Sequence, residues 1–93
     1  MRLMTALTLC LALLASTAFA RIPRSTAAVN DFKRANPCPV TGQWRGSCPG
    51  WEVDHMIALC AGGPDTPANM QWLTRSDHKQ KTKLDVMQCR LKN

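Results

Sequence analysis

The sequence predicts an α+β fold in one small domain, and three observations lead to this prediction. Apolar residues spaced three and four apart between residues 26 and 35 predict a helix with one buried face. Two short extended segments, near residues 51–60 and 70–73, flank a loop that contains Gly62-Gly63 and so run back on each other as antiparallel strands. A C-terminal helix and two expected disulfides complete the fold. A chain of 93 residues is long enough for only one domain.

The first twenty residues read as a signal peptide rather than as part of this domain. Arg2 supplies a positive start, residues 3–14 are almost continuously apolar, and Ala18-Phe19-Ala20 offers small residues at a cleavage site. An uncleaved membrane anchor is the alternative, but the apolar run is short for a span. We therefore expect an exported protein, periplasmic or secreted, whose domain covers residues 21–93 and keeps no stable membrane association after cleavage.

The charge of the chain favours a polyanionic partner. The formal net charge is +6, and removing residues 1–20 removes one cation and no acid, which leaves +5 on the mature chain. Nucleic acid, anionic lipid and acidic polysaccharide would all be attracted to this charge. Charge alone does not choose among them, and it also serves solubility.

Four cysteines remain after cleavage, and an even number in a small exported chain predicts two disulfides. Of the three pairings we favour Cys38–Cys48, which closes a short loop, and Cys60–Cys89, which ties the first strand to the last helix. A bridge over such a loop stabilises a domain by about 3 kcal/mol. A structural zinc site is the competing interpretation, but no two cysteines stand two residues apart.

The elements follow in order. Ser25 or Thr26 can cap the first helix, and Asn36-Pro37 stops it. Its apolar face consists of Ala28, Val29, Phe32 and Ala35. Residues 38–50 predict an irregular loop. Residues 51–60 predict a strand that is broken or ends near Asp-His, 61–68 a loop and 70–73 a second strand.

The final helix is expected to be capped by Thr74 or Ser76 and to end near Cys89. Its predicted inner face consists of Leu84, Met87 and Leu91, while Lys79, Lys81, Lys83 and Arg90 lie outside.

Four residues carry the chemistry: Asp54, His55, Asn69 and His78. A carboxylate is a ligand for hard cations, and a neutral imidazole can deprotonate water near neutral pH. The amide of Asn69 can bond to backbone or imidazole and hold the base in one tautomer, while His78 can reach back as a second metal ligand. Each residue alone is usually an ordinary surface or turn residue. The ordered set, with its glycine turn, is far more specific.

These residues resemble the HNH endonuclease motif. The matching positions are residues 54–59, Gly62-Gly63, residues 69–73 and His78-Lys79, with eight residues between Asn69 and His78. The resemblance covers residues 51–85 and implies a ββα-metal finger that cuts DNA with one divalent ion. It implies that His55 is the general base, that Asp54 and His78 bind the metal, and that Asn69 orients the base or assists the metal.

The chain departs from the family pattern at three positions. Ala58 stands where many members have proline, and Thr74 and Asp77 stand where many have cysteines that bind a structural zinc. We expect the disulfides to replace that zinc.

The basic residues near the motif predict contacts with nucleic-acid phosphates, which carry no sequence information. They are Arg45, Arg75, Lys79, Lys81 and Lys83. Trp44, Trp51 and Trp72 are expected in the core, and Trp44, next to Arg45, is also kept as a candidate contact. No recognition helix is visible, so we expect weak sequence preference.

The sequence therefore predicts an endonuclease that hydrolyses DNA, with RNA as a further candidate substrate. It does not define the oligomeric state, and a monomer is assumed. The cofactor would be one divalent ion, Mg²⁺, Mn²⁺, Ni²⁺ or Zn²⁺. The alternative is a cationic module that binds nucleic acid without catalysis.

Overall fold

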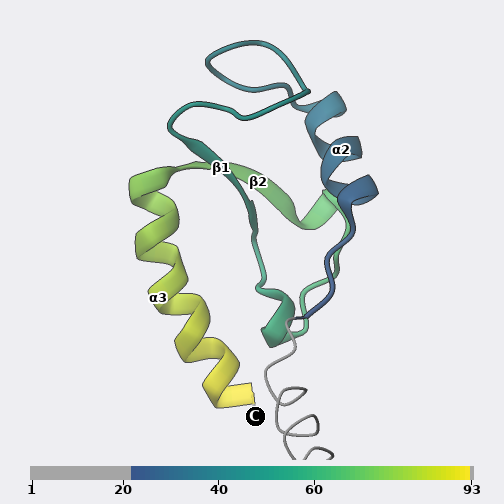
Figure 1. Ribbon diagram of the computed structural model, residues 1–93. Coiled ribbons are helices and arrows are strands. Elements are labelled where there is room, and N and C mark those ends of the chain that lie inside the picture. Colours follow the sequence, from purple (N-terminus) through teal and green to yellow (C-terminus); the bar gives the residue numbers. More distant parts are fainter. Residues whose placement is uncertain (1–21, 93) are drawn as a thin grey trace, which may run out of the picture.

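The computed structural model describes residues 22–92, so the predicted signal peptide lies outside the described residues. Figure 1 shows helix α2 on one side of a two-stranded sheet and helix α3 on the other. The elements are α2 (Thr26–Ala35), β1 (Trp51–His55), the 3₁₀ turns η2 (Leu59–Ala61) and η3 (Pro67–Asn69), β2 (Met70–Thr74) and α3 (Arg75–Lys92). The predicted α+β class is confirmed. No helix in this part of the chain is long and apolar enough to cross a membrane.

Helix α2 begins as its sequence predicts, and of its predicted apolar face Phe32 is buried, Ala28 and Val29 are partly buried and Ala35 is exposed. The hydroxyl of Ser25 accepts a hydrogen bond from the backbone N–H of Ala28 at 3.1 Å, which satisfies one of the free donors at the helix start. Phe32 is buried and its ring centroid lies 5.9 Å from that of Trp72 on β2. The Trp72 indole N–H donates to the carbonyl of Asn36 at 2.7 Å. These contacts fix α2 against the second strand.

Strands β1 and β2 pair antiparallel, with Asp54 opposite Gln71 and His55 opposite Met70. Strand β1 is shorter than the predicted segment 51–60, because it ends at His55 and is followed by a turn and then η2. Successive side chains on a strand point to opposite faces. His55 is the last residue of β1, so the chain leaves the strand directly after it.

Both predicted disulfides are present. Cys38–Cys48 closes the irregular loop, with Cα atoms 5.5 Å apart, and Cys60–Cys89 joins η2 to α3, with Cα atoms 5.4 Å apart. Cys38 and Cys48 are among the most buried side chains of the described residues. The Cys38–Cys48 bridge therefore supplies buried apolar groups to the irregular loop.

Helix α3 starts at Arg75, where the Thr74 hydroxyl accepts from the backbone N–H of Asp77 at 3.1 Å. This identifies Thr74 as the cap among the two predicted. The helix runs to Lys92, beyond the expected end at Cys89, which is held in the helix by its bridge to Cys60.

The predicted inner face of α3 is wrong. Leu84, Met87 and Leu91 are 60%, 58% and 85% exposed. The side that faces the rest of the protein carries instead His78, Lys81, Asp85 and Cys89, which are spaced three and four apart. This face is held to the rest of the protein by ion pairs and a disulfide. The spacing of apolar residues therefore could not identify it.

Candidate active site

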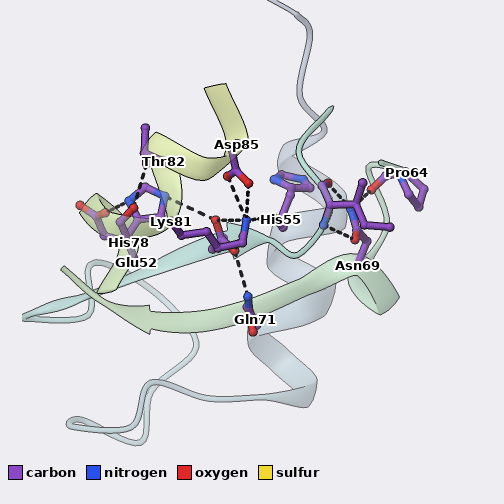
Figure 2. Close-up of polar contacts among 11 residues, drawn as sticks. Glu52, His55, Pro64, Asn69, Gln71, His78, Lys81, Thr82 and Asp85 are labelled. Carbon is purple, nitrogen blue, oxygen red and sulfur yellow. Dashed lines mark hydrogen bonds and ion pairs between the residues drawn. The ribbon is translucent and has the colours of Figure 1, made fainter. Parts of the chain in front are cut away.

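Asp54 lies in the core although it is charged. It is 3% exposed, and Asn69 is the other polar residue among the buried side chains of the described chain. One carboxylate oxygen accepts from the Gln71 amide at 3.0 Å, across the strand pair, and both oxygens lie within 3.3 Å of the Lys81 ammonium (Figure 2). Burying a carboxylate is costly unless it is paired and hydrogen-bonded. These partners satisfy that condition.

The His55 imidazole is held by Asp65, which the sequence analysis did not identify. His55 Nε2 lies 2.9 Å from Asp65 Oδ1, and Asp65 Oδ2 accepts from the backbone N–H of Ser25 at 2.6 Å. The hydrogen bond from His55, and after it that from Ser25, lowers the pKa of Asp65 below its ordinary value. An ionised Asp65 accepts the proton of Nε2, which leaves the lone pair of His55 on Nδ1.

Asn69 bonds to backbone and not to the His55 ring. Its Oδ1 accepts from the N–H of Ile57 at 3.0 Å, and its Nδ2 donates to the carbonyls of Ile57 and Pro64, both at 2.9 Å (Figure 2). Of the two bonding modes that the sequence left open, this geometry uses the first. Asn69 thus fixes the turn that follows β1, and with it the path of the chain directly after His55.

Gly63 explains why this turn needs glycine. A Cβ atom at Gly63 would lie 1.9 Å from the carbonyl oxygen of Ile57 and 2.9 Å from the Asn69 amide nitrogen. A side chain would therefore displace the turn that Asn69 holds. Nearby, Ala58 has φ −58°, a value that proline also adopts, so this departure from the family pattern keeps the backbone conformation.

His78 reaches the sheet from the first turn of α3. Its Nδ1 lies 2.5 Å from Glu52 Oε2, and its Nε2 lies 3.7 Å from Asp54 Oδ1. Glu52 and Asp54 are two residues apart on β1, so both side chains lie on the same face of the strand. Glu52 holds one ring nitrogen and directs the other towards Asp54.

Lys81 occupies the centre of this polar cluster. Its ammonium donates to Asp54, to the carbonyl of His55 at 2.7 Å and to both oxygens of Asp85 at 3.0 and 2.9 Å (Figure 2). Burial alone would lower the pKa of Lys81, but the hydrogen bonds to Asp85 and Asp54 outweigh burial and raise the pKa above its ordinary value. Lys81 is therefore a cation held inside the protein, one turn of α3 beyond His78.

Three of the four motif residues open onto one pocket. A cavity of about 760 Å³ is lined by Asp54, His55 and His78, together with residues that include Arg24 and Asp85. Asn69 does not line it. The structure thus brings together the carboxylate and both imidazoles, and Asn69 lies behind them as a support.

The donor set suits a divalent ion bound by two side chains. Within residues 22–92 there is no group of three or more His, Cys, Asp or Glu side chains that could hold a metal ion. However, the 3.7 Å between Asp54 Oδ1 and His78 Nε2 allows both atoms to approach one ion at about 2.0–2.2 Å. Cations that assist phosphate chemistry commonly take one or two carboxylates from the protein and complete their shell with water and substrate oxygens. The residues therefore fit the expected metal.

The predicted phosphate contacts divide into two groups. Lys79 and Lys83 are exposed on α3, and Arg75 is exposed beside Glu52 at 3.9 Å. The guanidinium of Arg45 lies over the Trp44 ring. Lys81 differs, because its ammonium is surrounded by carboxylates and its side chain is 18% exposed.

Four polar neighbours of the site were not predicted from the sequence, namely Glu52, Asp65, Gln71 and Asp85. Two of them carried a signal in the sequence. Glu52 stands two residues before Asp54 on a strand, and Asp85 stands four residues after Lys81 on a helix, so each shares a face with its neighbour. Gln71 depends on the strand register and Asp65 on the path of a loop, and neither can be read from local spacing.

Comparison with known proteins agrees with this geometry. The profile of the HNH endonuclease family matches residues 37–84, which is more than half of the chain. No curated protein and no solved structure matches the chain. The family match begins at the irregular loop and includes both strands, the glycine turn and the part of α3 that carries His78 and Lys81. On this evidence the chain belongs to the HNH endonuclease family.

Proposed function

We propose that this protein is a metal-dependent endonuclease that hydrolyses the phosphodiester bonds of DNA, with RNA as an alternative substrate. The observation that carries the proposal is that Asp54, His55 and His78 line one pocket. Each of them contacts a different polar side chain, and these partners are Lys81, Asp65 and Glu52. These contacts hold the three side chains at the pocket that we propose takes the substrate.

His55 is the proposed general base. Asp65 accepts the Nε2 proton, so the Nδ1 lone pair takes the proton of the attacking water. The imidazolium that forms is stabilised by the adjacent Asp65 carboxylate. A positioned base of this kind contributes about 10²–10⁴-fold to the rate.

Asp54 and His78 are the proposed ligands of one divalent ion, Mg²⁺, Mn²⁺, Ni²⁺ or Zn²⁺. When bound, the ion supplies Lewis-acid polarisation of the phosphoryl oxygen and stabilisation of the leaving oxygen. Glu52 fixes His78 so that Nε2 faces Asp54. Lys81 and Gln71 keep the Asp54 carboxylate in place.

The substrate contacts are proposed for Arg45, Arg75, Lys79 and Lys83, which lie on exposed parts of the loop and of α3. Contacts of this kind meet the phosphate backbone and carry no sequence information. We therefore expect cleavage with weak sequence preference. Lys81 is omitted from this set, because Asp54, Asp85 and the His55 carbonyl already surround its ammonium within the protein.

The proposal includes export by the predicted signal peptide to the periplasm or the medium, and the mature chain is assumed to be a monomer. Two disulfides support the first part, because such bonds persist in oxidising compartments.

The test is nicking of supercoiled plasmid by the oxidised mature protein with each of the four metals. Wild type should nick the plasmid, and His55→Ala should lose about 10²–10⁴-fold of that rate. Gln80→Ala, an exposed change on the same helix as His78, is the matched control and should nick at the wild-type rate.

Absence of nicking with every metal, or equal nicking by His55→Ala, would contradict the proposal. If His55→Ala and wild type then bound the plasmid with equal affinity, the binding module would be the better description.

A further inference from the structure

We propose that Arg34, Trp44 and Arg45 form a second phosphate-binding site, the arginine platform, which grips the nucleic-acid backbone outside the catalytic pocket. The guanidinium carbons of Arg34 and Arg45 lie 4.3 Å and 4.8 Å from the centroid of the Trp44 ring. None of these three residues is among those that line the pocket. The proposal rests on the proposed function in that it takes nucleic acid as the ligand.

The platform is built from two segments that are fixed to each other. Arg34 belongs to the last turn of α2, while Trp44 and Arg45 belong to the loop that Cys38–Cys48 closes. The Lys33 ammonium donates to the carbonyl of Gly46 at 3.2 Å and joins the helix to the loop. Long arginine side chains lose rotational freedom when they bind a ligand. Here the aromatic ring and the closed loop have already ordered them.

The chemistry of the platform suits phosphate. A planar guanidinium stacks on an aromatic ring through its face and keeps its N–H edge for a phosphate oxygen. With two guanidiniums over the ring, Trp44 itself offers little room for stacking with a base. The platform therefore favours the backbone over the bases.

The local charge agrees with this assignment. Arg34 also pairs with Asp31 at 3.0 Å, so one of its interactions is already made within the protein. This region carries three cations and one acid, which gives a local net charge of +2; they are Lys33, Arg34, Arg45 and Asp31. An anionic partner is attracted to this end of the molecule.

The platform lies beyond the end of β1 that is farther from the catalytic pocket. The loop leads directly into this strand, where the N–H of Trp51 donates to the carbonyl of Cys48 at 3.0 Å, and Figure 1 shows the loop beyond the sheet. Trp51 and His55 are at opposite ends of β1, which corresponds to about 13 Å at ~3.3 Å per residue. Phosphates of one DNA strand rise by ~3.4 Å per step. The platform would thus meet phosphates about four or more steps from the bond that is cut.

The experiment measures DNA binding without cleavage. A labelled 20-base-pair duplex is titrated with His55→Ala protein in the absence of metal, at several salt concentrations. Introducing Arg34→Ala and Arg45→Ala together into the His55→Ala protein should reduce the magnitude of the slope of log affinity against log salt by about two. Each phosphate contact contributes about 0.9 to this slope. Replacing both arginines by lysine should keep most of the slope and lower the affinity, since the charge remains and the planar fork is lost.

Two controls separate the platform from general charge. Arg90→Ala with Lys92→Ala removes the same two charges from the far end of α3 and should change the slope by less than half as much. Trp44→Leu keeps both charges and should leave the slope unchanged while weakening binding about fivefold, because the ring no longer orders the guanidiniums. Circular dichroism of each variant checks that the fold is kept.

An equal change of slope in the platform and control variants would overturn the proposal. So would loss of binding to vesicles of anionic lipid with unchanged binding to DNA, which would assign the site to a membrane. The readout needs no catalysis, so failure of wild type to nick plasmid would count against the proposed function and leave this test standing.

Discussion

His55 and Asp65 stand ten residues apart in the sequence, and Nε2 of the first lies 2.9 Å from Oδ1 of the second. The other oxygen of Asp65 accepts from the backbone N–H of Ser25, 40 residues away, at 2.6 Å. One loop carboxylate therefore joins the start of α2 to the proposed general base. The N-terminal helix, which lies outside the HNH motif, is in this way part of the support of the site.

Asp65→Asn tests this relationship in catalysis. The substitution keeps the shape of the side chain, removes its charge and no longer fixes the proton on Nε2, so the nicking rate should fall by about tenfold or more, within the 10²–10⁴-fold that a general base contributes. The rate is measured on supercoiled plasmid at saturating metal. Asp77→Asn, an exposed carboxylate at the start of α3, is the matched control. Similar rates for Asp65→Asn and wild type would show that His55 needs no such partner.

The stability of the protein should depend on pH through the same residue. The pKa of Asp65 is lowered below its ordinary value of 3.8, so its charged form stabilises the fold. That contribution is fully present above the ordinary pKa and is lost as the pH falls through the lower pKa of the folded state. Asp65→Asn should therefore be less stable than wild type in urea at pH 6, and the difference should shrink below pH 3.8. A difference that stays constant down to pH 2 would contradict this role.

Glu52→Gln tests the second carboxylate–histidine pair. Glu52 lies 2.5 Å from Nδ1 of His78 and orients the proposed metal ligand. Loss of such an outer partner typically weakens metal binding about 10- to 100-fold. Calorimetric titration with Mn²⁺ measures this directly and needs no activity. Asp31→Asn removes a carboxylate on α2 and should leave the affinity unchanged; an equal loss in both variants would point to a general effect of charge.

The main effect of Asn69→Ala should be a lower free energy of unfolding. The buried amide makes three hydrogen bonds to the backbone of Ile57 and Pro64. Leaving one such buried group without a partner costs about 1–3 kcal/mol. We therefore expect the free energy of unfolding to fall by about 2–4 kcal/mol in total. Urea denaturation measures the fall, and the exposed change Gln80→Ala should stay within about 0.5 kcal/mol of wild type. A neutral Asn69→Ala would show that the turn is held by other contacts.

The two disulfides should differ in their effect on the site. Cys60–Cys89 spans 29 residues and holds α3 against η2, whereas Cys38–Cys48 spans 10 and closes the irregular loop. Helix α3 has no buried residue, so losing its bridge leaves mainly the polar contacts of Lys81 and His78 to hold it.

Cys60→Ser with Cys89→Ser should lower the free energy of unfolding by about 3–4 kcal/mol and strongly reduce nicking. Cys38→Ser with Cys48→Ser should reduce nicking less, because this loop does not line the pocket. The reverse order of the two variants in the nicking assay would contradict this view of α3.

The sequence by itself determined the elements and the family. Helical spacing, the Ser25 cap, the glycine turn and the cysteine count predicted α2, the strand pair and both disulfides, because each signal is local or follows from a small set of pairings. The Asp-His pair and the spacing to His78 identified the family for the same reason, since the motif is contained in one short stretch.

Only the tertiary structure decided what stands behind these residues. The pairing of His55 with Asp65 depends on the path of a loop, and the pairing of His78 with Glu52 depends on how α3 crosses the sheet. The inner face of α3 was mispredicted because its contacts are ionic, and hydrophobic spacing reports only faces that exclude water. The polar contacts of this site join residues that are far apart in the sequence. No periodic pattern in a sequence predicts contacts of this kind.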